Sequence, residues 1–84
     1  MAGLSSKIES LLFVAGKSLT AKKIAELVCV KEKEAEAALA QLQSEYAERQ
    51  SGIQLFSTGK MWQAGTAGEN VAVVEQFVKE EFAG

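Results

Sequence analysis

The sequence predicts a winged helix-turn-helix domain that is mostly α-helical, with three helices, a small two-stranded β-hairpin as the wing, and an extra C-terminal helix. Apolar residues recur at helical spacing in three segments before Gly52 and again in the last segment. A short alternating stretch, broken at Gly59, lies between these helical regions. The length of 84 residues suits one small unit, so we expect residues 1–84 to form a single winged-helix domain.

The first predicted helix covers residues 4–15. At 100° per residue its core-facing side contains Leu4, Ile8, Leu11, Leu12 and Ala15. Ser6 and Glu9 match a capping box near its start, and Gly16 begins the following turn. The second helix follows Thr20, its expected N-cap. Its inward-facing residues are Ile24, Leu27 and Val28.

The third predicted helix covers residues 32–49. Its inner stripe consists of Ala35, Ala38, Leu39, Leu42 and Tyr46. The turn before it reads Cys29-Val30-Lys31. Because the chain has no His and no second cysteine, we interpret Cys29 as a small packing residue rather than a reactive thiol.

Residues 53–58 and 61–64 are the strands of the predicted hairpin, joined by a very short loop at Gly59-Lys60. Thr66 and Glu69 match a second capping box, which opens the last helix at residues 69–82. The inner side of that helix is expected to contain Val71, Val74, Phe77, Val78 and Phe82.

The composition argues against catalytic and metal-binding chemistry. The chain has no His and no Asp, and one cysteine forms neither an internal disulfide nor a cysteine-rich zinc site. We therefore expect no enzymatic activity and no catalytic, metal or cofactor residue. The longest apolar run, residues 11–15, is far below the ~20 residues of a membrane helix. We expect a cytoplasmic protein without membrane contact.

DNA recognition is the usual role of a winged helix, but the charge pattern disfavours it. Residues 31–50 contain five glutamates against three cations, and the tip of the wing offers only Lys60. An acidic helix repels phosphate, whereas binding needs a clustered positive surface. We expect no strong direct DNA binding, and a small helix-turn-helix transcription regulator is the alternative function.

Several phrases of the chain resemble one family in their order and spacing. They are KIESLLFVAG at residues 7–16, Leu19-Thr20, QLQSEYAER at residues 41–49 and GIQL at residues 52–55. Trp62, Gln63 and Thr66 match the second strand of the family's hairpin. Together they resemble the N-terminal winged-helix domain of the segregation and condensation protein B family over nearly the whole chain. No single phrase is a catalytic motif.

The resemblance implies a non-enzymatic assembly module of a bacterial condensin-like complex, active in chromosome condensation and partition during the cell cycle. It implies a longer, nucleoid-associated protein with two winged-helix domains, of which this chain supplies the first. The partners would be a second copy, as a homodimer, and the kleisin subunit, segregation and condensation protein A. Through the kleisin, the module would reach an ATPase of the structural-maintenance-of-chromosomes (SMC) class.

Three positions depart from the family pattern. Cys29 stands where Gly is usual, Lys31 stands where a Ser or Thr cap is usual, and Gly65 replaces a common basic residue. A non-glycine residue in a left-handed turn and a missing cap would each cost roughly 1 kcal/mol.

Two surfaces are candidates for protein contact. Phe13 points almost opposite the core side of the first helix, and Val14 lies on its flank. Phe13 could meet a second copy, or it could tuck under the hairpin or against the last helix. On the third helix, small residues form an outer stripe that would admit another helix or simply favour helix formation. Its members are Ala37, Ala40, Ser44 and Ala47.

Overall fold

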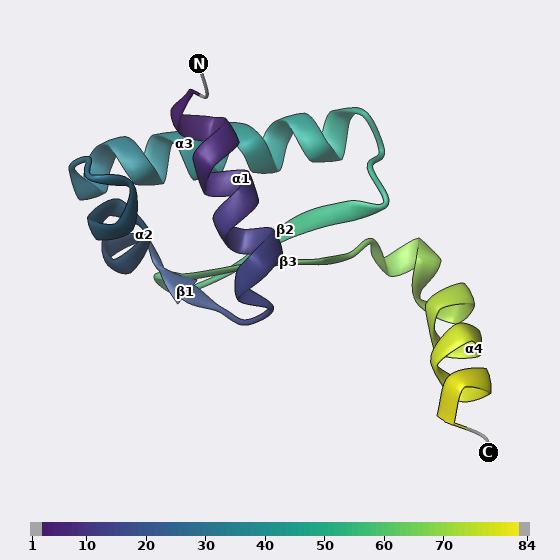
Figure 1. Ribbon diagram of the computed structural model, residues 1–84. Coiled ribbons are helices and arrows are strands. Elements are labelled where there is room, and N and C mark those ends of the chain that lie inside the picture. The colour runs from purple at the N-terminus through teal and green to yellow at the C-terminus, as the bar shows by residue number, and fades with distance from the viewer. Residues whose placement is uncertain (1–2, 83–84) are drawn as a thin grey trace.

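The computed structural model describes residues 3–82, in which three helices pack beside a small sheet and a fourth helix projects from the body (Figure 1). The elements, in order, are α1 (Leu4–Ala15), β1 (Leu19–Thr20), α2 (Ala21–Val28), α3 (Glu32–Glu48), β2 (Ile53–Thr58), β3 (Met61–Thr66), a 3₁₀ helix (Gly68–Asn70) and α4 (Val71–Phe82). This order confirms the predicted winged-helix architecture.

The wing contains a third strand that the sequence analysis did not predict. The sheet order is β1-β3-β2, and all its pairings are antiparallel. In β1, Leu19 pairs with Trp62, and the Ala21 N–H donates to the Lys60 carbonyl at 3.2 Å. A two-residue strand is too short to show alternation, so it forms because an extended segment before α2 meets the free edge of β3. The predicted two-stranded hairpin is otherwise correct, with Gly59 at φ 61° in its loop.

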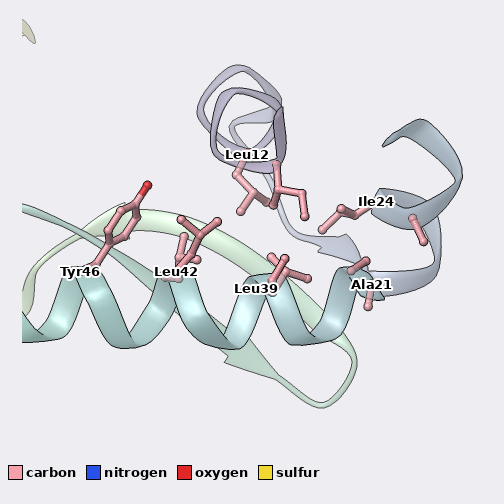
Figure 2. Close-up of a cluster of buried hydrophobic side chains, with 11 residues drawn as sticks. Leu12, Ala21, Ile24, Leu39, Leu42 and Tyr46 are labelled. Atoms are coloured by element: carbon pink, nitrogen blue, oxygen red, sulfur yellow. The ribbon is translucent and has the colours of Figure 1, made fainter. Parts of the chain in front are cut away.

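The core lies on one face of α3. The predicted inner stripe of this helix is confirmed, since all five of its residues are buried: Ala35, Ala38, Leu39, Leu42 and Tyr46. Figure 2 shows Leu12 of α1 and Ile24 of α2 pointing toward this stripe. Ile8, Ile24 and Leu39 are the largest fully buried side chains. Burying each contributes about 1.5–3 kcal/mol.

Two predicted capping boxes are wrong. The N-cap of α1 is Gly3, which offers no side-chain acceptor, and the Lys7 N–H donates to the Gly3 carbonyl at 3.1 Å. Ser6 therefore lies inside the helix. Thr66 pairs with Ile53 as the last residue of β3, so the strand continues past its predicted end and the 3₁₀ helix starts after it. The predicted cap at Thr20 is confirmed, because its hydroxyl accepts from the Lys23 N–H at 3.0 Å.

Leu27 does not face inward as predicted, and 50% of it is exposed. The buried residues of α2 are Ala21, Ile24 and Ala25, with Val28 partly buried beside them. At 100° per residue Leu27 lies about 60° beyond Ile24, on the side away from this arc. The apolar residue therefore sits past the edge of the α2 contact face.

The predicted inner side of α4 faces solvent. Every residue of α4 is exposed, including the five apolar residues predicted to be covered: Val71, Val74, Phe77, Val78 and Phe82. Within residues 3–82, the 3₁₀ helix before it is the only element with which α4 makes extended contact. Figure 1 shows α4 leading away from α1–α3. The predicted helix is present, but the prediction of a covered inner side is wrong, because residues 3–66 supply no surface that packs against α4.

The turn between α2 and α3 is a Schellman motif with a cysteine in its left-handed position. Cys29 has φ 60° and ψ 48°. The Val30 N–H donates to the Ala25 carbonyl at 3.0 Å, and the Cys29 N–H donates to the Glu26 carbonyl at 3.3 Å. A Cβ at such a φ costs roughly 1 kcal/mol. Cys29 is exposed, so its interpretation as a packing residue is wrong.

The start of α3 lacks a side-chain cap. Lys31 is the N-cap residue, with an extended backbone at φ −74° and ψ 151°, and its ammonium group has no acceptor atom. The first backbone N–H groups of α3 therefore receive no side-chain bond from this position.

Cys29→Gly combined with Lys31→Ser is expected to raise the free energy of unfolding by roughly 1–2 kcal/mol. Glycine removes the Cβ from the left-handed turn. Serine supplies the missing acceptor three residues before Glu34, which completes a capping box. Thermal unfolding should show a gain of about 4–8 °C for each kcal/mol. Cys29→Ala, which retains a Cβ, is the control and should gain little. A lower Tm for the double variant would contradict the proposed turn energetics.

Candidate protein-interaction groove

An open groove of about 460 Å³ lies between the C-terminal end of α1, the C-terminal end of α3 and the sheet. We call it the Phe13 groove. Its lining consists of Glu9, Ser10, Leu12, Phe13, Val14, Tyr46, Arg49, Ser51, Ile53, Leu55 and Ala64. Most of the exposed lining surface is therefore apolar, and two of the sequence-predicted interface residues belong to it.

Phe13 and Val14 form an exposed wall of the groove. Their side chains are 81% and 80% exposed. The prediction that Phe13 lies outside the core is confirmed, and the alternative that it tucks under the hairpin or against the last helix is wrong. The cause is the run of apolar residues 11–15, which is wider than the single stripe that α1 can bury against α3.

The floor of the groove is an aromatic and charged cluster. The Tyr46 hydroxyl donates to Glu9 Oε2, which joins α3 to α1. The Arg49 guanidinium carbon lies 4.6 Å from the centroid of the Tyr46 ring. Burial, followed by the hydrogen bond and the charge of Glu9, raises the pKa of Tyr46 to about 12. The phenol therefore stays neutral at physiological pH and remains a donor to Glu9.

Glutamine side chains fasten the end of α3 to β2 beside the groove. Gln43 Nε2 donates to the Leu55 carbonyl at 2.9 Å. Gln54 Nε2 donates to the Tyr46 carbonyl at 3.0 Å and to the Ser51 carbonyl at 2.8 Å. The first bond joins α3 to the backbone of β2, and the other two join β2 to the end of α3 and to the loop after it, so together they hold the groove walls in place. Sequence reasoning missed them, since an isolated glutamine carries no sign of its partner.

The outer stripe of α3 lies on a different surface from the Phe13 groove. All four of its predicted residues are exposed, but none lines the groove: Ala37, Ala40, Ser44 and Ala47. Helical periodicity places them on the opposite side of α3 from the buried stripe. The structure thus brings Phe13 and Val14 together with Tyr46 and Arg49, but it does not bring them to the outer stripe.

Neither a metal centre nor a membrane span is found in residues 3–82. No group of three or more His, Cys, Asp or Glu side chains in this range could hold a metal ion. None of its helices combines the length and the hydropathy that crossing a bilayer requires. The titratable residues that line the groove are Glu9, Tyr46 and Arg49.

Comparison with known proteins agrees with the fold and with the sequence resemblance. The family model described as "Segregation and condensation complex subunit ScpB" matches residues 6–83. Segregation and condensation protein B of Desulforamulus reducens is 30% identical over 79 residues, 94% of this chain and 44% of that protein. The Geobacillus thermodenitrificans protein of the same name is 34% identical over 73 residues, 86% of this chain and 35% of that protein. The chain thus spans less than half the length of these curated relatives.

Two solved structures share the architecture. The crystal structure of ScpB from Mycobacterium tuberculosis superposes with a TM-score of 0.88 at 27% identity, covering 93% of this chain and 49% of that one. A dimer of the ScpB N-terminal domain complexed with a ScpA peptide superposes with a TM-score of 0.82 at 29% identity, covering 92% of this chain and 93% of that one. Since the family model matches all but the first five residues and the last, the chain belongs to the family of the segregation and condensation complex subunit ScpB.

Proposed function

We propose that this chain is a non-enzymatic assembly module of a condensin-like SMC–kleisin complex, acting in chromosome condensation and partition. In this proposal it corresponds to the N-terminal winged-helix domain of a two-domain, cytoplasmic and nucleoid-associated protein. It forms a homodimer and binds the kleisin subunit ScpA, through which it reaches the SMC ATPase. The proposal is supported by the family membership and by the similarity to a ScpB N-terminal domain that was crystallised as a dimer with a ScpA peptide.

The observation that carries the proposal is the exposed apolar wall of the Phe13 groove. A large aromatic side chain that is 81% exposed next to an equally exposed valine is unusual on a small monomeric domain. Aromatic residues beside a pocket are frequent anchors of protein interfaces.

Phe13→Glu is expected to convert a dimer into a folded monomer. Desolvating two new carboxylates would weaken association by several kcal/mol, whereas an exposed side chain contributes little to the fold. Sedimentation velocity measures the mass, and circular dichroism checks the fold. Phe13→Leu keeps the apolar wall and should remain dimeric. A wild-type chain that stays monomeric at hundreds of micromolar would rule out the homodimer.

The outer stripe of α3 is proposed as a second interface, used by the kleisin. Four small side chains along one side of this helix allow close approach of a partner helix. Ala40→Arg is expected to weaken binding of a ScpA peptide at least about tenfold, measured by calorimetry, without changing the dimer. Gln41→Arg adds the same charge at the next exposed position and is the matched control. Equal affinities for the two variants would exclude the stripe as the kleisin site.

Direct DNA binding, the alternative function, is expected to be absent. We predict no specific complex with duplex DNA in the micromolar range at physiological salt, because α3 presents exposed carboxylates such as Glu34, Glu36 and Glu45. A gel-shift titration at several salt concentrations tests this. A variant in which these three residues become lysine should gain salt-sensitive binding and shows that the assay is responsive. Wild-type retention with a clear sequence preference would favour the transcription-regulator alternative.

A further inference from the structure

The chain carries two unpartnered apolar surfaces, the Phe13 groove and the apolar side of α4. We infer that these surfaces are partners of each other across two copies of the chain. In this arrangement α4 of each protomer lies in the Phe13 groove of the other, and the two helices are exchanged around a two-fold axis. The inference rests on the proposed homodimer and adds which segment fills which groove.

Five apolar residues of α4 lie on one side of the helix, with Glu81 among them, and we call this side the α4 face. It consists of Val71, Val74, Phe77, Val78 and Phe82. These residues have the i, i+3, i+4 and i+7 relationships by which an amphipathic helix docks into a groove. The exposed fraction reaches 84% at Phe82. A 12-residue helix with such a face is marginal in water on its own, so a partner surface is required to stabilise it.

The path of the chain directs α4 away from its own groove. The Ala67 N–H donates to the Gly52 carbonyl at 2.9 Å, and the Asn70 N–H donates to the Ala67 carbonyl at 2.9 Å. Ala67 is buried, and the 3₁₀ helix Gly68–Asn70 continues directly into α4, with Val71 already in helical geometry. Between β3 and the 3₁₀ helix there is one residue, Ala67, and it is buried and hydrogen-bonded. Figure 1 shows α4 leading away from the body of its own chain. Returning α4 to its own groove would strain the Ala67–Gly52 bond that fixes this direction, whereas docking on a second copy leaves the bond intact.

The available area matches a dimer. The α4 face, Phe13, Val14 and Ile53 together expose on the order of 800 Å² per protomer, which is about what one partner contributes to a standard interface. A helix-in-groove contact made twice around a two-fold axis is closed, because both grooves and both helices are then occupied within the dimer. The 460 Å³ groove accommodates side chains rather than a whole helix, so Phe77 and Phe82 are the expected anchors.

A matched pair of substitutions on α4 tests the inference. Val78→Glu places a carboxylate in the centre of the α4 face, and we expect it to shift sedimentation from dimer to monomer. Gln76→Glu adds a carboxylate to the same helix at an exposed residue that lies about 160° around the helix from Val78 and away from the α4 face. It should leave the dimer unchanged. Dimers of equal stability in both variants would overturn the inference.

Cross-linking tests the pairing itself. Two versions of the chain, both with Cys29→Ser, carry either Val14→Cys or Val74→Cys, and one bears a tag that changes its mass. The two versions are mixed, denatured and refolded together. A short bismaleimide should then join one version to the other and yield few links between two copies of the same version. Predominant links between two Val14→Cys chains would show that the grooves face each other and would overturn the exchange.

The same design separates failure of the exchange from failure of the dimer. A chain carrying both cysteine substitutions would link within itself if α4 returned to its own groove, and this product migrates as a monomer. A wild-type chain that is monomeric in sedimentation overturns the proposed homodimer, and the exchange with it. If the chain remains a dimer with Val78→Glu, and the doubly substituted chain is linked only within itself, the exchange is wrong but the proposed homodimer is retained.

Discussion

Burial of one face of α3 is the constraint on which the rest of the structure depends. Helices α1 and α2 pack against the stripe of α3 that runs from Ala35 to Tyr46, and β2 packs near the C-terminal end of α3. Leu39, at the centre of the stripe, is fully buried. In residues 3–82 the buried core cluster is built on this face, so its loss would leave the sheet without support. The position of the Phe13 groove follows from the same packing, since its floor is the last buried residue of the stripe.

Tyr46 links the core to the candidate interface. Its ring is buried with Leu42 and Leu39 (Figure 2), while its hydroxyl and the neighbouring Arg49 reach the groove. Because the Tyr46 ring is packed in the core, the part of the Phe13 groove formed by this residue is held in a fixed position. Association with a prearranged groove loses less conformational freedom than association with flexible loops, which favours a defined binding geometry.

Periodicity predicted the elements that lie against this core and was less informative elsewhere. The stripe of α3 was predicted residue by residue, because a buried helix face leaves an unambiguous pattern. The pattern in α4 is equally clear. It indicates which side of the helix is apolar, but it does not indicate which surface covers that side. Phe13 was recognised as an outward residue because five consecutive apolar positions exceed one stripe. Ile53 and Arg49 were not recognised as its neighbours, since that adjacency is created by the way α3 and β2 meet. The strand at Leu19–Thr20 was missed because two residues have no period.

The left-handed turn at Cys29 also has a practical consequence. The only thiol of the chain is exposed there, on a backbone restrained by two turn hydrogen bonds, and it does not line the groove. A nitroxide spin label attached to this thiol would be held by a restrained backbone, and each protomer would carry one label. Any symmetric assembly of this chain would then contain a single pair of spins per dimer. The dipolar coupling between them would measure how the two bodies are arranged in solution, with every residue of the proposed contact left in its native form.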